Sequence, residues 1–126
     1  MERTRLIVID DDASFGNFVA QVVMGLDIDV DVVTSAKQFE KLYSSHPYDI
    51  VTTDISMPDK DGIELIEDLA EIDCHAAIII ISGQDQVLLK GTEKIAKQKG
   101  LNIVATLQKP FDVEEFEAAV MSVVNQ

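Results

Sequence analysis

Five short apolar runs alternate with five amphipathic segments along this chain of 126 residues, and this alternation constrains the fold more than any other feature. Runs of this length that are almost wholly apolar are typical of strands covered on both faces of a sheet. The expected strands are residues 6–9, 30–33, 50–53, 77–81 and 103–107. The segments that follow them repeat apolar residues at helical spacing. The chain is therefore predicted to fold as one α/β domain, a parallel sheet with helices on both faces.

The same spacing predicts which helical side chains are buried. In the first amphipathic segment the expected inner face consists of Phe15, Phe18, Val19, Val22, Val23 and Leu26. In the third it consists of Leu65, Ile66, Leu69 and Ile72. Residues 55–60 are expected to form a loop, and Gly100 is expected to cap the end of the fourth helix.

Four of the five expected strands end in residues that an apolar core would not select: Asp10-Asp11-Asp12, Asp54, Ser82 and Lys109. Because the carboxyl ends of parallel strands share one edge of the sheet, these side chains should meet there. Several carboxylates at close range repel one another unless a cation lies among them, and Mg²⁺ is the hard cation that oxygen ligands favour. Taken singly, each residue also has an ordinary interpretation as a helix cap, a turn residue or a surface lysine.

Charge and composition exclude several other classes of protein. With 23 acidic against 10 basic residues the net charge is −13, which argues against direct binding of nucleic acid by this domain. A single cysteine, Cys74, excludes an intrachain disulfide and a multi-thiolate metal site. No apolar run reaches the ~18 residues of a membrane span. We therefore expect a cytoplasmic domain with no membrane partner.

These residues, in this order, resemble the receiver domain of two-component response regulators. The resemblance is carried by the following segments: Asp10-Asp11-Asp12, Asp54-Ile55-Ser56-Met57-Pro58-Asp59-Lys60-Asp61-Gly62, Ser82-Gly83 and Lys109-Pro110-Phe111. It implies a doubly wound, flavodoxin-like (βα)5 fold with strand order 2-1-3-4-5. It also implies that residues 1–126 form a single receiver domain without an output domain.

The resemblance assigns roles to the polar residues. Asp54 falls on the family's phosphoacceptor. Asp11 would bind Mg²⁺ directly and Asp10 mainly through water, with Asp54 and the backbone carbonyl of Ser56 completing the set. Mn²⁺ could take the place of Mg²⁺ in such a site.

Further positions correspond to the phosphate-binding and switching residues of the family. Ser82 and Lys109 correspond to the hydroxyl and the ammonium that contact the phosphoryl group. The side chains of Ser56 and Gln84 would flank the path of the water that hydrolyses it. Thr106 stands where the family usually has an aromatic switch residue, so the usual movement of a ring cannot operate here. A cis peptide bond is expected at Lys109-Pro110.

The implied function is phosphoacceptance in a phosphorelay. The donor would be the phosphohistidine of a sensor histidine kinase or of a phosphotransfer protein, or a small acyl phosphate. The domain would phosphorylate and dephosphorylate itself at Asp54 with no separate substrate, so it is not expected to be an enzyme in the usual sense.

A looser resemblance concerns the output. The segments Ile81-Ser82-Gly83-Gln84-Asp85 and 96–111 resemble receivers that precede EAL-type cyclic-di-GMP phosphodiesterase domains. The expectation from the sequence is either a stand-alone receiver or a receiver excised from a longer protein with a fused output domain.

Two alternatives remain at this stage. A phosphohydrolase resembling the haloacid dehalogenase superfamily would use Asp10, Asp12, Ser82 and Lys109 around Mg²⁺, but it leaves Asp54 without a role and lacks an acidic pair after Lys109. The other alternative is a degenerate receiver that only binds partners.

Overall fold

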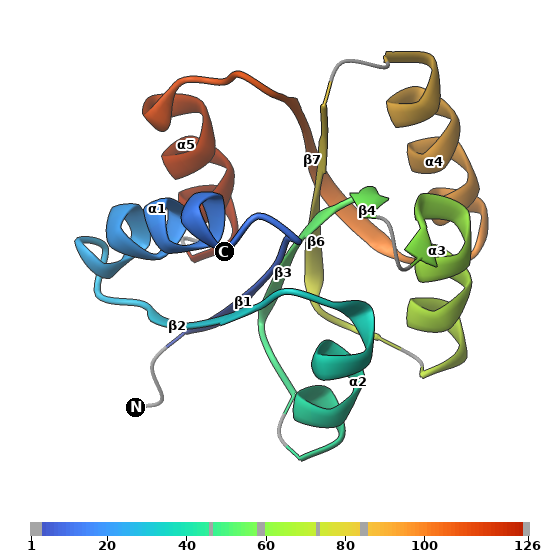
Figure 1. Cartoon of the computed structure of the whole chain (residues 1–126), viewed down its shortest axis with the longest axis horizontal. Helices are drawn as coiled ribbons and strands as arrows, with labels where there is room; N and C mark the ends of the chain where they lie inside the picture. Colours follow the sequence, from blue (N-terminus) through green and yellow to red (C-terminus); the bar gives the residue numbers. More distant parts are fainter. Residues whose placement is uncertain (1–3, 46, 58–59, 73, 84–85, 125–126) are drawn as a thin grey trace.

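The fold is built around a five-stranded parallel sheet (Figure 1). The computed structural model describes residues 4–45, 47–57, 60–72, 74–83 and 86–124. The five strands are β1 (Arg5–Ile9), β2 (Asp29–Val33), β3 (Ile50–Asp54), β6 (Ala77–Ser82) and β7 (Asn102–Gln108). Their order across the sheet is β2-β1-β3-β6-β7. Counted as five strands, this is the expected order 2-1-3-4-5, so the predicted fold class is confirmed.

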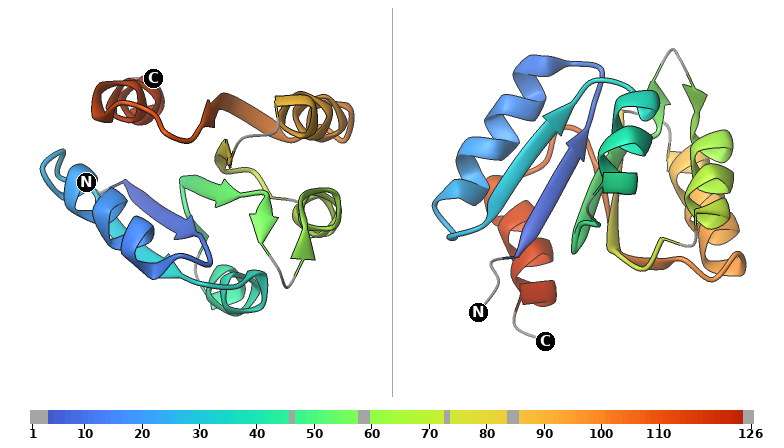
Figure 2. Two further views of the ribbon diagram at one scale, coloured as in Figure 1. Left: turned by 45° about the horizontal axis from the view of Figure 1, so that its top comes forward. Right: turned by 90° about the horizontal axis from the view of Figure 1, so that it is seen from below.

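Helices cover both faces of the sheet, as the two views of Figure 2 show. They are α1 (Ala13–Met24), α2 (Ala36–Ser45), α3 (Gly62–Glu71), α4 (Gln86–Gln98) and α5 (Val113–Val124). One apolar cluster joins the sheet to α1 and α5, and a second joins it to α2, α3 and α4. The core is therefore two apolar layers separated by the sheet.

Burial on both faces explains why the strands are apolar throughout. In β6, Ile78 and Ile80 belong to the cluster under α2, α3 and α4, whereas Ile79 and Ile81 belong to the cluster under α1 and α5. None of these four side chains is more than 1% exposed. Successive residues of a strand point to opposite faces, so a strand between two helical layers has no solvent side.

Local signals fix the ends of two helices. The Oδ1 atom of Asp12 accepts hydrogen bonds from the backbone N–H groups of Ser14 (3.0 Å) and Phe15 (3.3 Å), so Asp12 caps α1. Gly100 follows α4 with φ of +84°, a backbone conformation that favours glycine, which confirms the expected cap.

The structure corrects the sequence-based prediction at three places. The expected loop 55–60 contains β4 (Ser56–Met57) and the first residue of β5 (Lys60–Asp61), and these two strands pair antiparallel. Strands of two residues are too short for any periodicity to reveal. Phe18 and Ile72, expected on inner faces, are 45% and 39% exposed. Ile72 lies just beyond the last residue of α3, where the helical spacing no longer determines the direction of a side chain.

Candidate functional site

The carboxyl edge of the sheet brings the predicted polar residues together. Asp10 directly follows β1, Asp54 and Ser82 end β3 and β6, and Lys109 directly follows β7. Asp10, Asp54 and Ser82 are all at least 95% buried. Carboxylate oxygens of Asp10, Asp11 and Asp54 lie within 4.8 Å of one another. The clustering expected from the strand ends is thus present.

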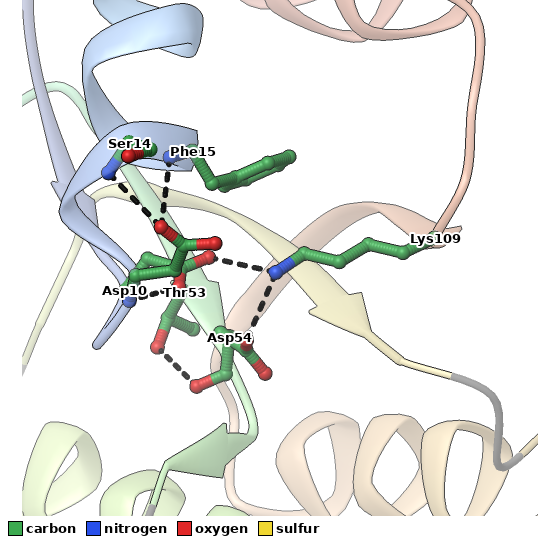
Figure 3. A network of polar contacts seen from close by, with 7 residues as sticks. Asp10, Ser14, Phe15, Thr53, Asp54 and Lys109 are labelled. Atoms are coloured by element: carbon green, nitrogen blue, oxygen red, sulfur yellow. Dashed lines mark hydrogen bonds and ion pairs between the residues drawn. The ribbon is translucent and has the colours of Figure 1, made fainter.

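Lys109 lies at the centre of this group (Figure 3). Its Nζ atom is 3.0 Å from Oδ2 of Asp10 and 3.2 Å from Oδ2 of Asp54. Its backbone N–H donates to the carbonyl oxygen of Ser82 at 2.8 Å, and the peptide bond between Lys109 and Pro110 is cis, as expected. One lysine therefore connects the ends of three strands.

The pKa values of Asp10 and Lys109 are both raised, which disfavours the charged form of the carboxyl group and favours the charged form of the lysine. Burial raises the pKa of Asp10, and it outweighs the hydrogen bond from the N–H of Asp12 (2.9 Å) and the attraction of Lys109, which lower it. For Lys109, burial works against the charged form, but its hydrogen bonds and attraction to Asp10 and Asp54 prevail, so its pKa is raised. The carboxylates thus favour the charged form of Lys109. For Asp10, the hydrogen bonds and the positive charge of Lys109 do not fully offset the cost of burying a carboxylate.

Two of the remaining predicted residues, Ser56 and Thr106, belong to strands of the structure. Ser56 belongs to β4, the strand that follows Asp54 after one residue. Thr106 is half-buried on β7 and is paired in register with Ile80 of β6. Gln84 lies outside the described residues, so its expected role stays a prediction.

Two contacts in the site were not anticipated from the sequence. The Nζ atom of Lys109 is 4.0 Å from the ring centroid of Phe15, and Oγ1 of Thr53 donates to the backbone oxygen of Asp54 at 3.2 Å. The helical spacing assigned Phe15 to the core. Its place in the first turn after the acidic run was the one signal that could have indicated a position at the site.

The geometry also separates the three neighbouring aspartates. Asp10 and Asp11 belong to the carboxylate group with Asp54, whereas Asp12 caps α1. The haloacid dehalogenase interpretation needs Asp12 at the metal and leaves Asp54 without a role. The structure has the reverse arrangement.

Comparison with known proteins agrees with this geometry. The family model of the response regulator receiver domain matches residues 6–121. The chain belongs to this family. The receiver domain is 28% identical over 125 residues to the chemotaxis protein CheY of Bacillus subtilis, covering 96% of this chain and 98% of CheY. A crystal structure of a response regulator from Colwellia psychrerythraea is 31% identical, with a TM-score of 0.82 and coverage of 99% of this chain and 100% of that one.

Another relative is longer than this chain. The regulatory protein VirG of Agrobacterium fabrum is 31% identical over 117 residues, which are 91% of this chain and 44% of VirG. Receiver domains of this family thus make up nearly the whole of one relative and less than half of another. The names of these relatives give no support to the expected EAL-type output domain. Among the described residues, no helix has the length and apolar character needed to cross a membrane.

Proposed function

We propose that this receiver domain accepts a phosphoryl group on the carboxylate of Asp54. The observation that carries the proposal is the position of Asp54: its Oδ2 atom lies 3.2 Å from the ammonium of Lys109, and its carboxylate lies within 4.8 Å of those of Asp10 and Asp11. A nucleophilic carboxylate beside a fixed cation is what transfer of a dianionic phosphoryl group requires.

The donor set fits a divalent metal ion. Among the described residues, three carboxyl groups lie together at this edge and the ammonium of Lys109 contacts two of them, so negative charge is in excess there, and the proposed side-chain ligands are all oxygens. Asp10, Asp11, Asp54 and the backbone carbonyl of Ser56 would hold Mg²⁺, or Mn²⁺ in its place. Such an ion, when bound, neutralises charge on the phosphoryl oxygens.

The residues of the chain account for the transfer step. An electron pair on the Asp54 carboxylate forms a new O–P bond while the P–N bond of the phosphohistidine breaks. The imidazole nitrogen keeps the electrons of that bond and gains a proton from solvent. Lys109 and the hydroxyl of Ser82 donate hydrogen bonds to phosphoryl oxygens, which stabilises the charge during transfer.

Hydrolysis returns the domain to its starting state. The oxygen of a water molecule bonds to phosphorus, the bond between phosphorus and Asp54 breaks, and inorganic phosphate leaves. We assign the side chains of Ser56 and Gln84 to the path of this water.

The proposal includes partners and location. The donor is a sensor histidine kinase or a phosphotransfer protein, and phosphorylation changes contact with an output domain or a separate partner. Since Thr106 offers no ring to move, the signal is proposed to pass through α4 and its flanking loops. Because a phosphohistidine made from ATP is an intracellular donor, the proposal also includes the cytoplasmic location expected from the sequence.

The test is phosphorylation by acetyl phosphate, followed by intact-protein mass spectrometry with and without Mg²⁺. The wild-type chain should gain one phosphoryl group only with Mg²⁺, and Asp54→Asn should gain none. Asp12→Asn is the matched control: asparagine also caps helices, and Asp12 lies outside the carboxylate group, so labelling should persist. Labelling retained in Asp54→Asn and lost in Asp10→Asn would instead favour the phosphohydrolase alternative. A wild-type chain that is never labelled would favour the degenerate receiver.

A further inference from the structure

The ammonium of Lys109 has a neighbour besides the two carboxylates, and this neighbour is the ring of Phe15. The distance from Nζ to the ring centroid is 4.0 Å, well inside the ~6 Å range of cation–π attraction. Figure 3 shows the Phe15 side chain extending from the first turn of α1 toward the lysine. That turn is held by the cap, because the N–H of Phe15 donates to Asp12.

Other aromatic rings hold Phe15 in this position. Phe111 packs edge-on against Phe15 with centroids 5.8 Å apart, and Phe111 in turn stacks on Phe116 at 6.1 Å. Phe116 is 2% exposed and belongs to the core between the sheet and α5. The ring beside the ammonium is thus connected to the core through a chain of aromatic contacts.

A pocket lies next to the side chain of Lys109 and leaves room for it to move. A pocket of about 400 Å³ adjoins the site, and it is lined by Phe15, Phe18, Gly83, Lys109, Pro110 and Phe111. The side chain of Lys109 is 26% exposed. A long lysine beside such a pocket has room to swing away from Asp54 unless something holds it.

The carboxylates alone hold the lysine less securely once a cation binds. Both ion-pair partners of Lys109 in Figure 3, Asp10 and Asp54, are also proposed ligands of the metal ion. A divalent cation on these oxygens competes with the ammonium and repels it. The ring of Phe15 carries no such conflict, because its attraction to the ammonium does not depend on the carboxylates.

We propose that Phe15 is a positioning residue that keeps the ammonium of Lys109 beside Asp54 before the phosphoryl group arrives. The inference rests on the proposed function. An anion that meets a preplaced ammonium does not have to immobilise a long, flexible side chain, and that immobilisation weakens binding by up to about tenfold. Phe15 therefore acts through Lys109.

The first test observes Lys109 in the protein without metal or phosphate. In NMR spectra of the chain with ¹³C-labelled lysine, the ε-methylene protons of Lys109 should be shifted upfield by the ring and should show restricted motion. Phe15→Leu should remove the shift and increase the mobility. Phe18→Leu is the comparison variant: the Phe18 ring lies 6.4 Å from that of Phe15 and lines the same pocket, but it is 45% exposed, and the ring beside the ammonium is that of Phe15. Phe18→Leu therefore removes a neighbour of Phe15 and keeps the ring beside the ammonium, so the upfield shift of the Lys109 signals should largely remain.

The second test measures binding of beryllofluoride in the presence of Mg²⁺. Phe15→Leu should raise the dissociation constant about fivefold, and Phe18→Leu should leave it within twofold. Phenylalanines with one, two and three fluorine atoms at position 15 keep the shape of the ring and weaken its attraction for cations. The affinity for beryllofluoride should fall stepwise along this series. The series also tests the role of the ring if Phe15→Leu does not fold.

The outcomes separate the two proposals. Beryllofluoride binding that is absent in the wild-type chain, or equal in Asp54→Asn, overturns the proposed function. The NMR measurement on the metal-free protein still decides whether Phe15 holds Lys109. An immobile Lys109 in Phe15→Leu, or affinity that is constant across the fluorinated series while wild-type binding depends on Asp54, overturns the role of Phe15.

Discussion

Replacing Thr52 with valine should make this receiver domain more stable. Thr52 lies on β3 two residues before Asp54 and is 0% exposed, and its Oγ1 atom has no hydrogen-bond partner among the residues that the structure describes. It is paired in register with Val8 and Ile79, both of which belong to the apolar cluster under α1 and α5. Because residues in register face the same side of a sheet, the hydroxyl group points into that apolar layer.

The magnitude follows from the cost of this hydroxyl. A buried donor left without a partner costs roughly 1–3 kcal/mol. Valine carries a methyl group where threonine has the hydroxyl, so the substitution leaves no cavity. We expect the free energy of unfolding to increase by about 1–2 kcal/mol, and each kcal/mol should raise the Tm of a domain of this size by roughly 3–6 °C.

The neighbouring residue is the control. Thr53 is also 0% exposed, but its Oγ1 atom donates to the backbone oxygen of Asp54, and its register partners Ile9 and Ile80 lie in the other apolar cluster. Thr53→Val should lower the free energy of unfolding by about 1 kcal/mol.

Urea titration followed by circular dichroism measures both variants, and an unchanged m-value confirms that the same amount of surface unfolds. The reasoning is refuted if Thr52→Val is no more stable than wild type, or if the two substitutions change stability in the same direction.

Three further predictions follow from other parts of the structure. Mg²⁺ at ten times its dissociation constant should stabilise the protein by about 1.4 kcal/mol in a thermal-shift assay, and an equal shift in Asp11→Ala would contradict the assignment of that carboxylate. Burial and the hydrogen bond to Asp31 raise the pKa of Tyr48 above its ordinary value. The folded state therefore favours the protonated phenol, and the contribution of Tyr48 to the free energy of unfolding is complete below pH ~10 and is lost as the pH rises further. Urea titrations between pH 9 and pH 11 should therefore show a shallower alkaline loss for Tyr48→Phe, and an unchanged slope would speak against it. A Cβ at Gly16 would lie 2.6 Å from Cγ1 of Val32, so Gly16→Ala should cost about 1–3 kcal/mol in unfolding experiments and should cost less in a Val32→Ala background. Equal costs in the two backgrounds would show that Val32 is not the obstacle.

Local patterns predicted most of the architecture. Strand β6 (Ala77–Ser82) and the helix that Asp12 caps depend on neighbours in sequence, so spacing and capping residues identify them. The prediction was wrong for strands of two residues and for the exposure of single side chains. The two-residue strands β4 and β5 contain no full period, and the exposure of Phe18 depends on what packs around α1 rather than on its spacing.

The candidate site likewise has features that the sequence predicted and features that it could not. The residue types at the strand ends predicted a cluster of carboxylates with a lysine, since the carboxyl ends of parallel strands must share an edge. Residue types could not distinguish Asp11 from Asp12, which differ only in the direction that the turn into α1 gives them. The resemblance to the receiver family supplied the roles that the residues alone left open.

By itself, then, the sequence determined the alternation of strands and helices and the chemistry collected at one edge, because both depend on periods of a few residues. Tertiary structure alone decided which groups touch. Lys109 meets Asp54 across 55 positions and Asp10 across 99. It meets the ring of Phe15 because α1 and the segment after β7 lie at the same edge of the sheet. Such contacts depend on strand order and helix packing, which no local period encodes.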